Sequence, residues 1–220
     1  MSDMRIISTA DGSHTLQSLT ERECYHSING ALQESRHVFI DAGLRKVISQ
    51  QPLNVLEVGF GTGLNALLTL LQAEKTCRVF YEAVEKYPVA IDIIDQLNYC
   101  DVLEVDKEKY FKPLHFSGWS KNISITDTFV LKKCHTDLLH YTPSREDFNL
   151  VYFDAFSPDS QPELWSVEIF STIYQHMKKG GVLVTYSSKG LVKQSLRSVG
   201  FTVERLAGAP GKRHMLRATK

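Results

Sequence analysis

The chain has 220 residues, of which 43% are hydrophobic and 23% are charged. These fractions lie near the averages of globular proteins, so they exclude a disordered or fibrous protein, and the length fits one domain over residues 1–220. The 25 basic and 25 acidic residues cancel, which argues against a uniformly basic nucleic-acid-binding protein. No apolar run approaches the length of a membrane-spanning helix, and residues 1–11 lack the pattern of a signal peptide. We therefore expect a cytoplasmic protein that does not bind membranes, with no obligate protein partner evident.

The cysteines are scattered and form none of the close pairs that zinc sites or small disulfide frameworks use. Cys134, His135 and His140 lie near one another in sequence, but their spacing matches no standard zinc pattern. We therefore expect free thiols and no metal ion. The four cysteines are Cys24, Cys77, Cys100 and Cys134.

Short β-type runs alternate with helical runs from residue 54 onward, which predicts a mostly parallel, doubly wound, Rossmann-like α/β sheet over residues 51–220. Gly180-Gly181 and Gly200 are expected to end two of the helices. The expected strands are 54–59, 78–84, 128–135, 148–154 and 182–187, and the expected helices are 64–74, 89–98, 167–177 and 191–199, with a possible helical piece at 105–110.

Two hairpins are expected outside the α/β repeat. The β-type runs 201–207 and 214–219 flank the turn-forming segment Gly208-Ala-Pro-Gly211, which predicts a C-terminal antiparallel hairpin. Asp11-Gly12 lies between β-type flanks within residues 4–19, which indicates a small β element in an N-terminal extension over residues 1–50.

A glycine-rich turn, Glu57-Val-Gly-Phe-Gly-Thr-Gly63, connects the first expected strand to the first expected helix. Glycines at this place let the backbone approach a ligand closely. Dinucleotide-binding loops space their glycines as Gly-x-Gly-x-x-Gly, whereas this loop has Gly59, Gly61 and Gly63. That spacing resembles motif I of class I S-adenosylmethionine-dependent methyltransferases, which implies that Glu57 faces the methionine ammonium of the cofactor.

Acidic residues end or follow three of the expected strands, whose carboxyl ends meet at one edge of a parallel sheet. Glu85 is placed to accept hydrogen bonds from ribose hydroxyls, or alternatively to pair with Lys86. Asp137 can reach an adenine amino group, or alternatively cap a helix. Asp154 is the candidate catalytic residue. An amine accepts a methyl group only through an aligned, neutral lone pair, and a carboxylate can orient or deprotonate the amine. The alternative is that Asp154 is a turn residue. Phe156 can form a wall of the same pocket.

The C-terminal part of the chain is basic. From Tyr186 onward the only acidic residue is Glu204, so the cations there form either a local positive surface or scattered solvated charges. The basic residues are Lys189, Lys193, Arg197, Arg205, Lys212, Arg213, Arg217 and Lys220.

With several motifs in the same order along the chain, the sequence resembles the methyltransferase domain of the MnmC family of bifunctional tRNA wobble-uridine modification enzymes and its stand-alone counterpart, MnmD. The resemblance spans nearly the whole chain. The motifs are Tyr25-His-Ser-x-x-Gly-Ala31 with Glu34-Ser35, Gly59-Phe-Gly-Thr-Gly-Leu-Asn65, Glu85-Lys-Tyr-Pro88, Asp154-Ala-Phe-Ser-Pro158, Pro162-Glu-Leu-Trp165, Tyr186-Ser-Ser-Lys-Gly190 and Gly208-x-Pro-Gly-Lys-Arg-His-Met215.

The resemblance implies methylation of the primary amine of 5-aminomethyl-(2-thio)uridine at the tRNA wobble position, with S-adenosylmethionine as methyl donor. It assigns catalysis to Asp154, the cofactor ribose to Glu85 and a further cofactor contact to Asn65. It also implies that Tyr25, His26 and Ser27 cover the active site. In bifunctional relatives a flavin-dependent oxidase domain follows, whereas this chain ends at Lys220, so we expect no flavin domain and no flavin requirement.

We expect the basic C-terminal segment to bind the tRNA backbone, with Lys212 and Arg213 contacting its phosphates.

Other functions remain open at this stage. A methyltransferase acting on another amine, or an aminopropyltransferase resembling spermidine synthase, would share the fold and the cofactor residues. A non-catalytic tRNA-binding module would not need Asp154. A nicotinamide oxidoreductase is disfavoured by the glycine spacing.

Overall fold

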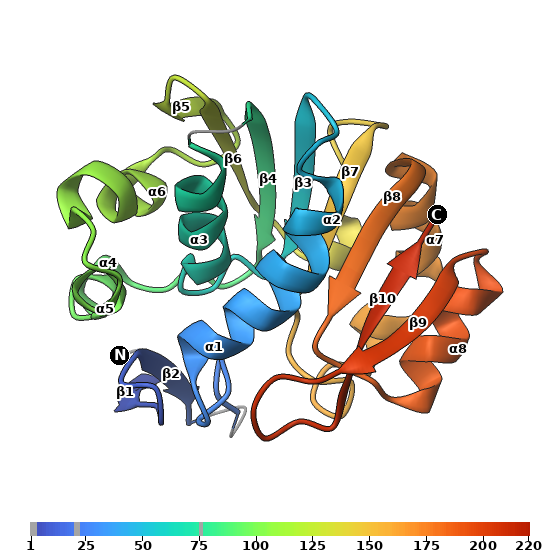
Figure 1. The fold of residues 1–220 in the computed structure, drawn as a ribbon, viewed down its shortest axis with the longest axis horizontal. Helices are drawn as coiled ribbons and strands as arrows, with labels where there is room; N and C mark the ends of the chain where they lie inside the picture. The colour runs from blue at the N-terminus through green and yellow to red at the C-terminus, as the bar shows by residue number, and fades with distance from the viewer. Residues whose placement is uncertain (1–3, 20–22, 75–76) are drawn as a thin grey trace.

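The computed structural model describes residues 4–19, 23–74 and 77–220 (Figure 1). Eight strands form one mixed sheet in the order β5-β6-β4-β3-β7-β8-β10-β9, in which β6, β4, β3, β7 and β8 are parallel. Both edges of the sheet are antiparallel, because β5 pairs with β6 and β10 pairs with β8 and β9. The strands are β3 (Leu53–Val58), β4 (Val79–Glu85), β5 (Asn122–Thr126), β6 (Phe129–His135), β7 (Phe148–Phe153), β8 (Met177–Thr185), β9 (Thr202–Ala207) and β10 (His214–Thr219).

Helices cover both faces of this sheet. α3 and the helical run formed by α1, the π-helical segment η1 and α2 share one hydrophobic cluster, whereas α7 and α8 belong to the cluster on the opposite face. The described helices are α1 (Ala31–Ser35), η1 (Arg36–Leu44), α2 (Arg45–Val47), α3 (Leu64–Ala73), α4 (Ile91–Ile94), α5 (Tyr99–Leu103), η2 (Lys107–Phe111), α6 (Lys112–Phe116), η3 (Leu138–His140), η4 (Pro162–Trp165), α7 (Val167–His176) and α8 (Gly190–Ser198).

The predicted doubly wound α/β fold with a C-terminal antiparallel hairpin is confirmed, and so is the small N-terminal hairpin of β1 (Met4–Ser8) and β2 (His14–Ser18). The extension over residues 1–50 also contains the run from α1 to α2, which was not predicted. No helix within the described ranges has the length and apolar character needed to cross a membrane.

The expected role of Gly180-Gly181 as a helix end is wrong. α7 ends at His176, and β8 begins at Met177, because Met177 pairs with Phe148 of β7. The glycines lie inside β8 where its register with β7 shifts, and Gly180 has a φ of +78° that favours glycine.

The expected helix over residues 89–98 is also wrong in extent, since only Ile91–Ile94 is helical and α5 follows from Tyr99. The Asn98 side chain accepts a hydrogen bond from the His14 backbone N–H and donates one to the Gly12 carbonyl. Asn98 therefore connects the segment between α4 and α5 to the β1–β2 hairpin, and the local sequence does not reveal this contact.

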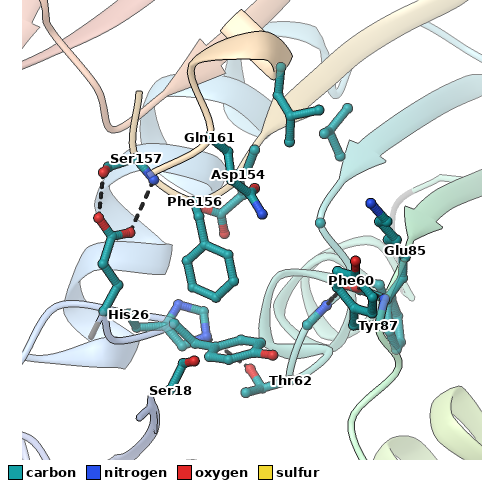
Figure 2. A pocket seen from close by; sticks show the side chains of 18 of the residues that line it. Ser18, His26, Phe60, Thr62, Glu85, Tyr87, Asp154, Phe156, Ser157 and Gln161 are labelled. Atoms are coloured by element: carbon teal, nitrogen blue, oxygen red, sulfur yellow. Dashed lines mark hydrogen bonds between the residues drawn. The ribbon is translucent and has the colours of Figure 1, made fainter. Parts of the chain in front are cut away.

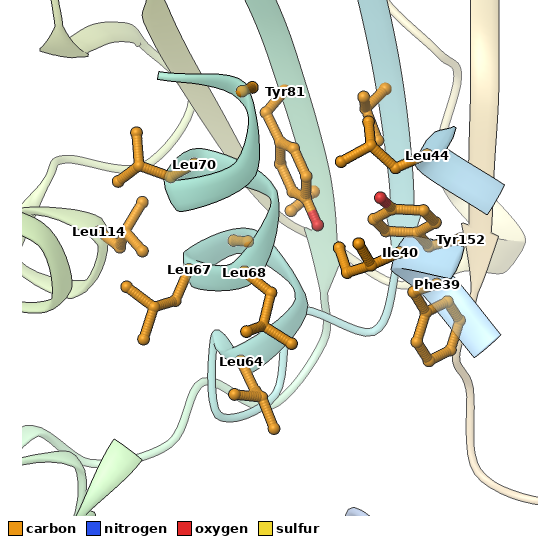
Figure 3. Close-up of a cluster of buried hydrophobic side chains, with 14 of the residues drawn as sticks. Phe39, Ile40, Leu44, Leu64, Leu67, Leu68, Leu70, Tyr81, Leu114 and Tyr152 are labelled. Carbon is orange, nitrogen blue, oxygen red and sulfur yellow. The ribbon is translucent and has the colours of Figure 1, made fainter. Parts of the chain in front are cut away.

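The core between α3, η1 and the sheet fixes where the site lies (Figure 3). Leu64 and Leu67 of α3 and Phe39 of η1 are buried beside Tyr81 of β4 and Tyr152 of β7. Each of the buried leucine and phenylalanine side chains stabilises the fold by about 1.5 to 3 kcal/mol. This packing holds the N-terminus of α3 over the carboxyl ends of β3, β4 and β7.

Candidate active site

A cavity of about 830 Å³ opens at the carboxyl ends of these strands (Figure 2). Its volume suits a small-molecule ligand. The N-terminal segment, the glycine loop and the loop after β7 all contribute to its wall. Of the predicted site residues, Tyr25, His26, Ser27, Gly59, Gly61, Asn65, Glu85, Asp137, Asp154, Phe156 and Lys212 line the cavity, whereas Glu57, Gly63 and Arg213 do not.

The glycine loop between β3 and α3 requires its glycines. Gly59 has a φ of +86°, and a Cβ atom there would lie 2.6 Å from the backbone carbonyl oxygen of Asp154. A Cβ atom on Gly61 would lie 3.0 Å from the ring of Tyr25. At Gly63, which precedes α3 with a φ of +71°, a Cβ atom would lie 2.7 Å from Nε2 of His115. The loop therefore packs closely against Asp154, Tyr25 and His115 of α6.

Glu85 is fixed by the backbone around it. Its Oε2 accepts a hydrogen bond from the Gly61 N–H at 2.9 Å, and its Oε1 accepts one from the Tyr87 N–H at 2.7 Å. Each carboxylate oxygen keeps further acceptor capacity for a ligand hydroxyl. The alternative pairing of Glu85 with Lys86 is not formed, because the Lys86 ammonium lies 2.8 Å from Asp137.

Asp137 forms the helix cap that the sequence offered as one alternative, and its contact with an adenine amino group stays a prediction. Its Oδ1 accepts a hydrogen bond from the Leu139 N–H at 3.0 Å and so caps η3, while the residue also lines the cavity. The hydrogen bond from Lys86 holds the pKa of the Asp137 carboxyl below its ordinary value. Asp137 is therefore an ionised acceptor at neutral pH.

Asp154 follows β7 and lies beside the cavity. Its Oδ2 accepts a hydrogen bond from the Asn65 side-chain amide at 2.8 Å. Burial raises the pKa of Asp154 to about 7, and the nearby Glu34 carboxylate contributes in the same direction. A carboxyl group that titrates near neutral pH is suited to accept a proton from a reacting group.

Glu57 lies behind the cavity wall. Its side chain is completely buried at the end of β3, and burial raises its pKa well above the ordinary value. The Tyr81 hydroxyl and the Asn65 amide face this carboxylate, but neither oxygen completes a hydrogen bond to a described residue. In this structure Glu57 supports the wall from beneath and does not form its surface.

The N-terminal segment covers one side of the cavity. The Tyr25 ring packs edge-on against Phe156, with centroids 5.2 Å apart. Nε2 of His26 lies 2.8 Å from the Thr62 hydroxyl of the glycine loop, and burial lowers the pKa of His26 to about 4, so the imidazole is neutral. The Ser27 N–H donates to Glu34 at 2.7 Å. The three residues predicted to cover the site thus lie together at the cavity.

Two acidic residues of this wall received no role from the sequence. Glu23 accepts hydrogen bonds from the Ser157 N–H at 3.1 Å, from the Ser157 hydroxyl and from the Ser160 hydroxyl at 2.6 Å, and so fastens the loop after Asp154. Glu34 pairs with Lys212 at 2.6 Å. Glu34 belongs to a quoted motif, whereas no sequence signal singles out Glu23.

The two residues predicted to contact phosphates are separated in the structure. Lys212 points into the cavity wall, where the buried Glu34 carboxylate attracts its ammonium group. The phosphate contact expected of Lys212 stays a prediction, since in this structure its ammonium group pairs with Glu34. Arg213 is exposed outside the cavity.

Within the described residues, no three His, Cys, Asp or Glu side chains converge as a metal site would require. All four cysteines have free thiols.

Comparison with known proteins decides the family. Residues 102–220 match the sequence profile of the S-adenosyl-L-methionine-dependent methyltransferases. The chain belongs to this methyltransferase family.

Two curated proteins similar in sequence to this chain share one name. The Legionella pneumophila (strain Corby) protein named tRNA 5-methylaminomethyl-2-thiouridine biosynthesis bifunctional protein MnmC is 32% identical over 227 residues, covering 90% of this chain and 34% of the relative. The protein of that name from Methylobacillus flagellatus is 29% identical, covering 88% of this chain and 32% of the relative. This chain thus spans about a third of the length of these curated relatives.

Solved structures show the same fold. Crystalline MnmC2 from Aquifex aeolicus matches with a TM-score of 0.77 at 27% identity, covering 100% of this chain and 71% of that one. Spermidine synthase from Thermotoga maritima matches with a TM-score of 0.63 at 13% identity, covering 98% of this chain and 68% of that one. At this identity the second match concerns the fold alone.

Proposed function

We propose that this methyltransferase methylates the primary amine of 5-aminomethyl-(2-thio)uridine at the wobble position of tRNA, giving 5-methylaminomethyl-(2-thio)uridine. The observation that carries the proposal is the Asp154 carboxyl group, which lines the cavity beside the glycine loop and whose pKa burial raises to about 7. The names of the MnmC relatives support tRNA as the substrate. The protein would then act in the cytoplasm, where tRNA is modified.

The residues present fit S-adenosylmethionine. Gly59 and Gly61 contribute to the cavity wall, Glu85 offers acceptors for ribose hydroxyls, and Asp137 offers one for an adenine amino group. When bound, the cofactor supplies an electrophilic methyl group on its sulfonium sulfur. The proposal needs neither a flavin nor a metal ion.

The chain's own residues prepare the amine. A substrate ammonium has no free lone pair, so a proton must leave before nitrogen can attack. Asp154 accepts that proton, and Asn65 keeps the carboxylate oriented through its 2.8 Å hydrogen bond. Tyr25 and Phe156 form an aromatic wall against which a uracil ring can stack.

The proposal is tested by mass spectrometry of nucleosides from tRNA carrying 5-aminomethyluridine, incubated with the protein and S-adenosylmethionine. We expect one methyl group to be added to the wobble nucleoside, and the rate to fall about 100-fold or more in Asp154→Asn. Glu204→Gln, which alters an exposed pair with Arg217, is the matched control. Cofactor binding without methylation of this nucleoside would refute the tRNA assignment.

An aminopropyltransferase is the second candidate, because the fold also matches spermidine synthase. Membership of the methyltransferase family weighs against it. Incubation with a polyamine precursor and decarboxylated S-adenosylmethionine separates the two activities, since only an aminopropyltransferase would lengthen the amine.

A further inference from the structure

One side of α8 carries a row of basic side chains. Lys189, Lys193 and Arg197 follow one another at intervals of four residues, so they lie on one side of the helix. Residues 187–203 include no acidic residue. The row is therefore positively charged along its whole length.

A shallow groove of about 420 Å³ runs along α8 beside this row. Its lining consists of the cations Lys193 and Arg197 and of the neighbouring row Gly190, Gln194 and Ser198. Gln194 and Ser198 are exposed, and a Cβ atom on Gly190 would meet no atom within 4 Å, so a ligand has room to approach the helix. The groove thus combines positive charge with exposed polar groups.

The cations of this surface are not neutralised within the protein. In the part of the chain that the structure describes, Lys193, Arg197 and Arg205 form no ion pair. Arg205 is exposed on the edge strand β9, beside α8 (Figure 1). Val203 belongs to the hydrophobic cluster under α8, and side chains two residues apart in a strand share a face, so Arg205 faces the same side of the sheet as α8. Lys193, Arg197 and Arg205 together form the α8 basic face.

The α8 basic face begins beside the wall of the cavity. Lys189, the residue that precedes α8, pairs with Asp159. Asp159 belongs to the loop after Asp154, and Phe156 and Gln161 of this loop line the cavity. From this point α8 extends over nine residues, or about 13 Å. The charged surface therefore leads from the cavity wall along the outside of the protein.

We propose that the α8 basic face binds the phosphate backbone of the tRNA next to the wobble nucleoside. This inference rests on the proposed function, in which that nucleoside occupies the cavity. The nucleoside stays bonded to its neighbours in the strand, so the phosphates beside it must follow the protein surface away from the cavity. Lys193 and Arg197 lie about 6 Å apart along the helix axis, so they can contact separate phosphates of one strand.

The composition of this surface fits a nucleic acid better than a protein partner. Protein interfaces have an apolar, largely uncharged centre. On α8, Leu191 is the one large apolar side chain that is exposed within the described residues. A polyanion needs no such centre, because release of its counterions drives binding.

The double variant Lys193→Gln/Arg197→Gln removes two charges and keeps side chains that favour a helix. Binding of a tRNA transcript to the full chain is measured by fluorescence anisotropy at several salt concentrations. We expect the affinity to fall about tenfold and the salt dependence to decrease by about two ions, since each lost phosphate contact leaves a counterion in place. Arg205→Gln should decrease it by about one ion. The affinity for S-adenosylmethionine, measured by calorimetry, should stay the same.

Lys46→Gln/Lys121→Gln is the matched control, because it removes the same net charge elsewhere. Both lysines are exposed and form no ion pair with a described residue; Lys46 lies in α2, and Lys121 precedes β5 at the opposite edge of the sheet from β9. Equal losses of tRNA affinity in the control and in the α8 variant would overturn the inference. So would a wild-type salt dependence in the α8 variant, or displacement of tRNA by poly-L-glutamate as effectively as by RNA of equal charge.

Methylation assays separate this inference from the proposed function. With tRNA carrying 5-aminomethyluridine, the KM for tRNA should rise about tenfold in the α8 variant while kcat stays constant. If the α8 variant loses tRNA affinity but the wild-type protein does not methylate the wobble nucleoside, the proposed function fails and the binding surface stands. If methylation proceeds with an unchanged KM in the α8 variant, the inference fails and the proposed function stands. Circular dichroism of each variant confirms that it is folded.

Discussion

Asp154→Asn is expected to slow methyl transfer about 100-fold or more and at the same time to stabilise the fold. The pKa of Asp154 rises from 3.8 to about 7 because the carboxyl group is buried next to Glu34. Between these values the folded state binds more protons than the unfolded state, so the free energy of unfolding decreases as the pH rises. An asparagine does not ionise, so the folded state does not lose this free energy as the pH rises. Its side-chain oxygen can still accept the hydrogen bond from Asn65.

The size of the gain follows from the pKa values. Each pKa unit corresponds to about 1.36 kcal/mol, so ionisation of Asp154 costs the folded state about 4 kcal/mol at most above pH 7. Asp154 is partly exposed to the cavity, where water screens the charge, so we expect Asp154→Asn to gain about 2 to 3 kcal/mol at pH 8. Near pH 4, where the wild-type residue is mostly protonated in the folded state, the gain should almost disappear.

Urea unfolding of both proteins at pH 4 and pH 8 measures this difference. Asp147→Asn is the matched control, because Arg145 lowers the pKa of Asp147 and its replacement should destabilise the fold at pH 8. The reasoning would be refuted if Asp154→Asn were no more stable than wild type at pH 8, or if its gain were equal at both pH values.

Three further changes test other parts of the site. Gly59→Ala would place a Cβ atom 2.6 Å from the Asp154 carbonyl oxygen, so methyl transfer should fall at least about tenfold, whereas Gly118→Ala, which meets no atom within 4 Å, should leave the rate unchanged in the same assay. Glu23→Ala removes the acceptor of Ser157 and Ser160, so hydrogen exchange of the backbone amides at residues 155–161 should accelerate, and equal exchange in both proteins would contradict the role of Glu23. Arg213→Ala should weaken tRNA binding and lower its salt dependence by about one ion while cofactor affinity stays constant, with Lys121→Ala, before the far edge strand β5, as control.

The local sequence was sufficient to predict features that depend only on neighbouring residues, such as backbone conformation and strand ends. The glycines at positions 59, 61 and 63 are recognisable because their backbone conformation has positive φ and their neighbours leave no room for a Cβ atom. Glu85 at the end of β4 and Asp154 after β7 could be placed because the strands of a parallel sheet end at one edge. Gly180-Gly181 misled the helix prediction, because pairing of β8 with β7 overrides the helix-ending tendency of glycine.

By itself the sequence determined the order of the parallel strands and of α3, α7 and α8, the glycine loop and the acidic residues at the strand ends, since hydrophobic periodicity and backbone conformation act over a few residues. Only the tertiary structure decided that Glu57 lies behind the wall, that Lys212 turns inward to Glu34 and that Glu23 fastens the loop after Asp154. These positions depend on burial and charge pairing between segments far apart in the chain. The proton affinity of Asp154 is a property of that enclosure, because desolvation and neighbouring charges arise only when both ends of the chain close over the cavity.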